Sequence, residues 1–118
     1  MARRVALALT GALLLVAVPA QAAVSKEEVA ASEWKAPASV EEAAARPALH
    51  RTLAAYLRKP GRWVRLAHAG GAAGSAWAQD MRSWLITLGI PADRIQIDPG
   101  LTDSGRLTLA VHEEGDQL

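Results

Sequence analysis

Two histidines stand at the ends of expected strands, and their imidazole groups are the side chains here best suited to binding a metal ion. His68 closes one apolar segment and His112 closes another. Asp98 or Glu113 would have to supply a carboxylate ligand beside them. Because each histidine ends a strand, the two could lie close together, but isolated histidines at strand ends are usually ordinary surface or hydrogen-bonded groups. The sequence therefore predicts no metal site.

Serine hydrolysis needs a nucleophile, a base and an acid, and the chain contains these residue types. Ser75 or Ser104 could combine with His68 and Asp98 in a triad. Such a serine normally stands on a sharp strand-to-helix turn with oxyanion donors nearby. Neither serine has that pattern around it. We therefore expect no catalytic residues and no enzyme activity.

A glycine-rich loop, residues 69–74, follows an expected strand and precedes an expected helix, as in dinucleotide-binding sites. The start of a helix attracts anions, but the first glycine of the G-x-G-x-x-G pattern is missing and the chain is short for such a fold. We interpret the loop as a structural turn and expect no cofactor. Any ligand site at this turn would use His68, Gly70, Gly71, Gly74 and Ser75.

The aromatic residues are unusual, with four Trp and no Phe. Trp77 and Trp84 are seven residues apart on one face of an expected helix, which indicates core positions. Trp63 and Arg65 share the face of a strand that points away from the expected core. Because Trp and Arg are favoured anchors of interfaces, both are candidates for a partner surface. The alternative is that Trp63 packs in the core or against the preceding segment.

Hydrophobic periodicity predicts two helices and three strands in the second half of the chain. Ser75 is the expected N-cap of the second helix, and Gly89-Ile90-Pro91 is its expected end. The elements are the helices 47–59 and 76–88 and the strands 62–68, 93–98 and 106–112. Their order, α-β-α-β-β, predicts an α/β (α+β) sandwich in which two helices pack on one face of a small mixed sheet.

The first 22 residues have the three parts of a bacterial secretory signal. Arg3 and Arg4 form the charged start, and the apolar run that follows is about 14 residues long, too short to span a bilayer. Small residues end the run, so we expect cleavage between Ala22 and Ala23. The mature chain is then expected to be a soluble periplasmic protein without a membrane anchor.

Cleavage removes two of the 13 basic residues and leaves 11 against 12 acidic ones in a mature chain of 96 residues. This balance gives no basic footprint for nucleic acid. The absence of cysteine excludes disulfides, thiol catalysis and a lipid-modified cysteine. The remaining length suits one small domain.

Two flanking segments complete the expected organisation. Residues 23–46 are rich in Ala and Glu and poor in large apolar side chains, which indicates a linker. Within it, Ser39 and Glu42 match a capping box and predict a short helix at 40–45. Residues 113–118 are expected to be an acidic tail, so the domain itself spans 47–112.

Residues 77–95 resemble the second helix and following strand of the OmpA-like, peptidoglycan-associated domain. In that family an Ala is followed seven residues later by Leu and then by Gly-Ile before the strand; here these are Ala78, Leu85 and Gly89-Ile90. The strand that ends in His68 and the last strand, opened by Arg106, are also similar. The resemblance covers residues 49–112 and implies the family's fold and a site for the diaminopimelate of peptidoglycan.

The chain departs from the family at the residues that hold this ligand. The family's Asp, two positions after the strand-end His, is Gly70 here, and its Arg before the helix Ala is Trp77. The loop between them is about eight residues shorter than in the family pattern, and no first strand is evident before residue 47. We therefore expect the fold to be retained without specific diaminopimelate binding.

Two functions remain open at this point. The first is a non-catalytic accessory of the cell envelope, such as part of a secretion or conjugation apparatus, that contacts an envelope protein through Trp63 and Arg65. The alternative is an OmpA-like peptidoglycan-binding module. Small size and the lack of a catalytic constellation favour the first.

Overall fold

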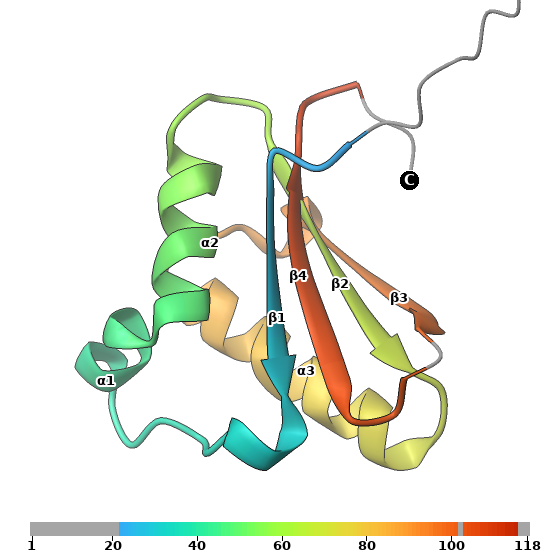
Figure 1. Ribbon diagram of the computed structural model, residues 1–118. Helices are drawn as coiled ribbons and strands as arrows, with labels where there is room; N and C mark the ends of the chain where they lie inside the picture. The colour runs from blue at the N-terminus through green and yellow to red at the C-terminus, as the bar shows by residue number, and fades with distance from the viewer. Residues whose placement is uncertain (1–21, 102, 116–118) are drawn as a thin grey trace, which may run out of the picture.

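The computed structural model describes residues 22–101 and 103–115, which form two layers, helices against a sheet (Figure 1). Residues 1–21 of the expected signal peptide and 116–118 of the expected tail lie outside this part. The elements are β1 (Ser25–Ala30), the 3-10 turn η2 (Ala31–Glu33), α1 (Val40–Ala45), α2 (Pro47–Leu57), β2 (Trp63–Ala69), α3 (Ala72–Thr87), the 3-10 turn η3 (Ala92–Arg94), β3 (Ile95–Leu101) and β4 (Arg106–His112). None of the helices among these residues is long and apolar enough to cross a membrane.

The strands form one mixed sheet in the order β1-β4-β2-β3. β2 and β3 run parallel, with α3 between them in the chain, as the strand-helix-strand pattern predicts. β4 lies between β1 and β2 and is antiparallel to both. The last strand therefore occupies a central position, although it comes at the end of the chain.

α2 and α3 cover one face of this sheet, which confirms the predicted sandwich. α2 packs on β1 and β4, and α3 packs on β2 and β3. Alternate residues of the central strands point towards the helices and are completely buried: Val64, Leu66, Leu107, Leu109 and Val111. The helices contribute Leu49, Ala78, Met81 and Leu85, which are also completely buried. The opposite face of the sheet carries no helix of the described residues.

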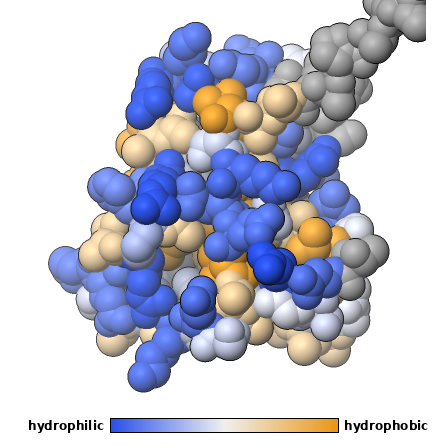
Figure 2. Space-filling model, in the orientation of Figure 1, coloured by the Kyte–Doolittle hydropathy of each residue, from blue (hydrophilic) through white to orange (hydrophobic). Residues whose placement is uncertain are grey.

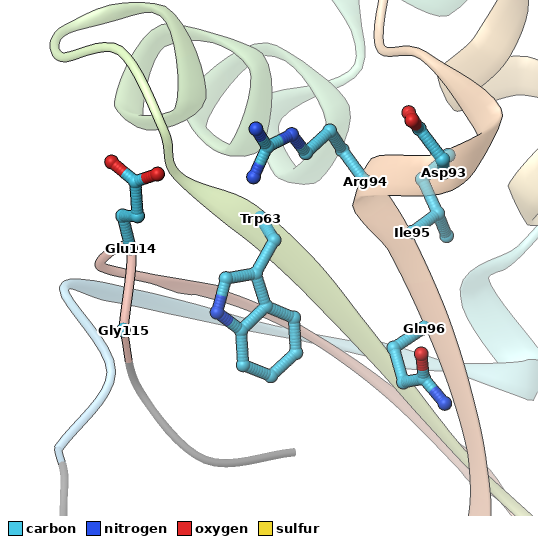
Figure 3. A pocket seen from close by; sticks show the side chains of 7 residues that line it. All are labelled: Trp63, Asp93, Arg94, Ile95, Gln96, Glu114 and Gly115. Atoms are coloured by element: carbon cyan, nitrogen blue, oxygen red, sulfur yellow. The ribbon is translucent and has the colours of Figure 1, made fainter.

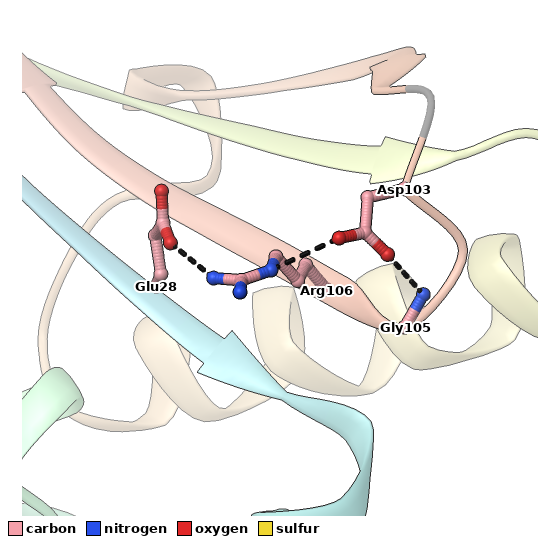
Figure 4. A network of polar contacts seen from close by, with 4 residues as sticks. All are labelled: Glu28, Asp103, Gly105 and Arg106. Carbon is pink, nitrogen blue, oxygen red and sulfur yellow. Dashed lines mark hydrogen bonds and ion pairs between the residues drawn. The ribbon is translucent and has the colours of Figure 1, made fainter.

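The interpretation of residues 23–46 as a linker is wrong, because residues 25–30 form the edge strand β1. Only Val29 of this strand is buried, and an edge strand needs few apolar side chains because β4 supplies its hydrogen bonds. Polar contacts add to the pairing. Arg106 of β4 donates to Glu28 of β1 and also to Asp103, whose other carboxylate oxygen accepts from Gly105 N–H (Figure 4).

The short helix predicted inside that segment is present as α1, with the expected bounds. The Ser39 hydroxyl accepts from the Glu42 amide at 3.1 Å. Glu42 reaches back to the amide of Ala38, one residue before the N-cap, at 3.0 Å. The same carboxylate accepts from Arg46 at 2.9 Å, which ties the first turn of α1 to its end.

α3 begins earlier than predicted, so Ser75 is not its N-cap. The N-cap is Gly71, with φ 102°, and Ser75 donates its amide to the Gly71 carbonyl inside the first turn. The end of α3 is as predicted: Ile90 donates to Leu85 and Gly89, with φ 116°, donates to Ile86. The other predicted bounds differ by no more than three residues, and β4 is identical.

Candidate functional site

The turn after β2 does not form an open pocket around His68. The imidazole is only 5% exposed, on the helix-covered side of the sheet. Its Nδ1 lies 2.6 Å from the carbonyl oxygen of Ala69. A Cβ added to Gly74 would come within 3.4 Å of the same nitrogen, so the first turn of α3 closes directly over the ring.

The other candidate ligand residues of this turn are separated from that imidazole. Gly70, Gly71 and Ser75 are exposed, whereas His68 is buried. The structure thus brings His68 and Gly74 together, with His68 buried and Gly74 partly exposed. A ligand at the surface of this turn would meet backbone groups and no charged side chain of the predicted set.

The helix-free face of the sheet carries the second predicted pair. Trp63 of β2 lies opposite His112 of β4, and their rings stack with centroids 4.6 Å apart and planes 17° apart. Arg65 lies on the same face with its guanidinium carbon 5.8 Å from the Trp63 ring centre. Trp63 is only 7% exposed, with His112 stacked on its ring and Arg65 beside it. The result is an aromatic platform on the helix-free face, where Thr108 and Ala110 are also buried.

Arg65 holds an unusual position for a cation. Its Nε is buried and has no hydrogen-bond partner among the described residues, while the residue as a whole remains partly exposed. A buried donor without an acceptor costs free energy.

A hollow of about 200 Å³ opens at the end of the sheet, against the edge of the Trp63 ring (Figure 3). Trp63 comes from the start of β2 and Gln96 from β3, and the remaining polar groups come from the turn η3 and the segment after β4. Its lining consists of Trp63, Asp93, Arg94, Ile95, Gln96, Glu114 and Gly115. Arg94 reaches across the top of the hollow and donates to the Gly61 carbonyl at 3.3 Å. An aromatic wall flanked by both signs of charge suits one polar or aromatic side chain of a partner.

A buried arginine next to this hollow fixes the end of β4. Arg62 is 4% exposed and donates to the Ala55 carbonyl of α2 at 2.7 Å and to Glu113 at 3.1 Å. The hydrogen bond from Arg62 is the main reason that the pKa of Glu113 is lowered, and the positive charges of Arg62 and Lys59 add to it. The clamp therefore ties α2, β2 and the segment that carries Glu114 together.

The two histidines that the sequence offered as metal ligands, His68 and His112, lie far apart in the sheet. His68 pairs with Leu107 and His112 with Trp63, so they stand at opposite ends of the β2–β4 ladder and on opposite faces. Asp98 lies on the helix-free face, away from His68, and its carboxylate accepts from the Gly100 amide. No group of three possible ligands occurs within the residues that the structure describes.

Sequence reasoning missed His112, Arg62 and Glu114 as parts of this region. His112 was considered only as a metal ligand, because its place opposite Trp63 follows from the β2–β4 register. Arg62 was noted only as a neighbour of Trp63 in the sequence, and its burial and its contacts with Ala55 and Glu113 were not predicted. The one available signal was that Arg62 and His112 stand at the ends of apolar strands.

Comparisons with known proteins give no assignment. No protein-family model matches the chain, and neither curated proteins nor solved structures include a significant match.

Proposed function

We propose that this protein is an exported, non-catalytic accessory of the cell envelope that binds a partner protein through the helix-free face of its sheet. The carrying observation is the stack of Trp63 on His112, with Arg65 above the ring and an open hollow at its edge. Stacking holds the indole in one orientation before any partner arrives. A preorganised anchor loses little side-chain entropy on binding.

Three features of the face support a protein rather than a small molecule as the ligand. The hollow measures about 200 Å³, which is below the range of pockets that enclose drug-sized ligands. Its polar groups belong to both charge classes, which suits the mixed rim of a protein interface. Arg65 is a partly exposed cation on this face and could pair with a carboxylate of the partner.

Site-specific cross-linking tests this surface. A photoreactive residue at Gln96, which is exposed and lines the hollow, should yield a defined cross-linked partner in cells. The same residue at Gln79, exposed on α3, is the matched control and should yield none. Adding Arg65→Ala should weaken the Gln96 product at least tenfold. Equal products at both positions, or none at Gln96, would contradict the proposal.

The export part of the proposal is supported by the arginines, apolar run and small residues of segment 1–22. It is tested by the intact mass of protein from the periplasmic fraction. That mass should equal the chain beginning at Ala23. Full-length protein retained in the inner membrane would contradict it.

One observation favours the alternative, an OmpA-like peptidoglycan-binding module. β1 supplies the first strand that this resemblance implies and that was not evident before residue 47. Against it, Gly70 and Trp77 replace the ligand-holding Asp and Arg, and His68 is buried. Sedimentation with purified peptidoglycan separates the two functions. The alternative would be established if the protein pellets with peptidoglycan, if free muropeptide abolishes this pelleting, and if the double variant His68→Ala, Gly71→Asp does not pellet.

A further inference from the structure

β1 is an edge strand whose outer backbone groups have no partner among the described residues. Within the part of the chain that the structure describes, β4 is the only strand paired with it. Ala31 donates to the Gly105 carbonyl, and hydrogen-bonded pairs alternate along an antiparallel ladder, so Glu27 and Val29 also bond towards β4. The N–H and C=O groups of Lys26 and Glu28 therefore point outward.

The side chains of this edge carry an alternating charge pattern. Lys26 and Glu28 are exposed on the helix-free face. Glu27, between them, lies on the helix-covered face and accepts from Arg51 of α2 at 3.2 Å. The view in which β1 lies towards the reader is mostly hydrophilic, with separate apolar spots (Figure 2).

The edge is also open to a second strand. A hollow of about 270 Å³ runs beside β1, between it and the start of α2, and Glu27, Val29 and Trp34 contribute to its lining. α2 therefore covers one face of β1 without covering its outer backbone groups. An added strand could lie here and hydrogen-bond along the whole edge.

We infer that a second copy of this chain pairs with β1 edge to edge, antiparallel, about a two-fold axis at Glu27. In this register Lys26 faces Glu28 of the second copy, and Glu28 faces its Lys26. The outward N–H and C=O groups of these residues then bond to one another, and two opposite-charge pairs flank the axis. The two sheets join into one continuous sheet, and the interface is closed by its own symmetry.

Among the registers that satisfy the backbone, this one alone places Lys26 opposite Glu28. An axis at Lys26 would place two Lys26 ammonium groups opposite each other, and an axis at Glu28 would leave Lys26 opposite the uncharged Ala30. Like charges directly opposite on a sheet are destabilising. At the inferred axis the two Glu27 side chains meet, and each is already paired with its own Arg51.

A single introduced cysteine tests the register, because the chain has none of its own. Glu27→Cys places two thiols at a non-hydrogen-bonded pair, with Cα atoms about 4.5 Å apart and within reach of a disulfide. Ser25→Cys, on the same face and strand, leaves its two Cα atoms about 14 Å apart. Mild oxidation of the purified protein should link Glu27→Cys into dimers by a disulfide, and Ser25→Cys should remain unlinked on a denaturing gel without reductant. Equal linking of both, or none with Glu27→Cys, overturns the register.

Charge reversal tests the dimer itself, with mass measured by light scattering over a dilution series. The unmodified protein should show twice the monomer mass, and Lys26→Glu should raise the dissociation constant at least tenfold. Combining Lys26→Glu with Glu28→Lys and Arg106→Glu should restore the dimer, because the exchanged charges again face each other and position 28 keeps an opposite charge on β4. Lys35→Glu, an exposed reversal of the same size outside β1, should change nothing. A monomeric unmodified protein, or an exchange variant that stays monomeric while its circular dichroism is native, overturns the inference.

Discussion

Gly74 lies where the first turn of α3 comes closest to the end of β2. A Cβ at this position would stand 2.2 Å from the carbonyl oxygen of Ala69, a backbone atom that cannot move aside cheaply. Helix propensity favours alanine over glycine here by about 1 kcal/mol. The steric contact is therefore expected to outweigh the propensity, and it explains why a glycine occupies a helix interior.

Gly74→Ala is expected to destabilise the protein by about 1–3 kcal/mol, since overpacking shifts the backbone. Gly70→Ala is the matched control, because nothing lies within 4 Å of the added Cβ and the backbone needs no positive φ. Urea unfolding of both variants provides the measurement. A Gly74→Ala variant as stable as the control would show that α3 does not pack this closely on β2.

Arg62 and Glu113 form an ion pair whose loss should appear in the pH dependence of stability. The pKa of Glu113 is lowered from 4.5 in the fold, by its hydrogen bond from Arg62 first. The ion pair therefore stabilises the fold when the pH is above the pKa that Glu113 has in the unfolded chain. This stabilisation is lost as the pH falls through the lowered pKa that Glu113 has in the fold. Glu42, bonded to Arg46 and Ala38, behaves in the same way.

The protein is accordingly expected to lose stability as pH falls from about 5 to 3. Glu113→Gln should flatten part of this dependence and leave the melting temperature at pH 3 nearly unchanged. Glu41→Gln, an exposed substitution on α1 that forms none of the ion pairs described, is the control. An identical pH profile for Glu113→Gln and the unmodified protein would show that the contact with Arg62 does not persist in solution.

Among the elements, β1 decides where the folded domain begins in the chain. The segment 23–46 holds a strand of the sheet and a helix, α1, whose Ala43 is completely buried. Its removal would expose the outer edge of β4, including the backbone groups that now bond to β1. The folding unit therefore begins near residue 24, where Val24 donates to Val111.

A chain starting at residue 47 is expected to be unfolded or to aggregate, whereas one starting at residue 23 should melt cooperatively. Circular dichroism and size-exclusion chromatography of the two chains distinguish these outcomes. If the shorter chain folds with the same melting temperature, segment 23–46 behaves as the linker that its composition suggested.

For the whole molecule, the core between the sheet and the two helices determines stability. Leu85 of α3 is completely buried in it, together with residues of every strand. Leu85→Ala is expected to cost about 2–5 kcal/mol, through lost burial and the cavity that remains. Leu57→Ala, at a side chain 66% exposed on α2, should cost little. Equal melting shifts would contradict the packing of α3 on the sheet.

Local patterns were sufficient for most of the elements. Helical and alternating periodicity located α2, α3, β2, β3 and β4, and cap residues located α1 and the end of α3. Each of these signals lies within a few neighbouring residues, such as Ser39 with Glu42 or Gly89 with Ile90. The same signals led to the mixed α/β class, because a strand, a helix and a strand in succession favour a parallel pair.

Contacts between distant residues had no such signal, and the fold alone establishes them. β1 is stable because β4, some 80 residues later, supplies its hydrogen bonds and Arg106 its charge partner. The β2–β4 register places His112 on Trp63, and the early start of α3 buries His68. Periodicity indicates which face of an element is apolar, whereas pairing and register depend on which elements meet. The edge strand, the aromatic platform and the closed turn are therefore determined only when the chain is packed.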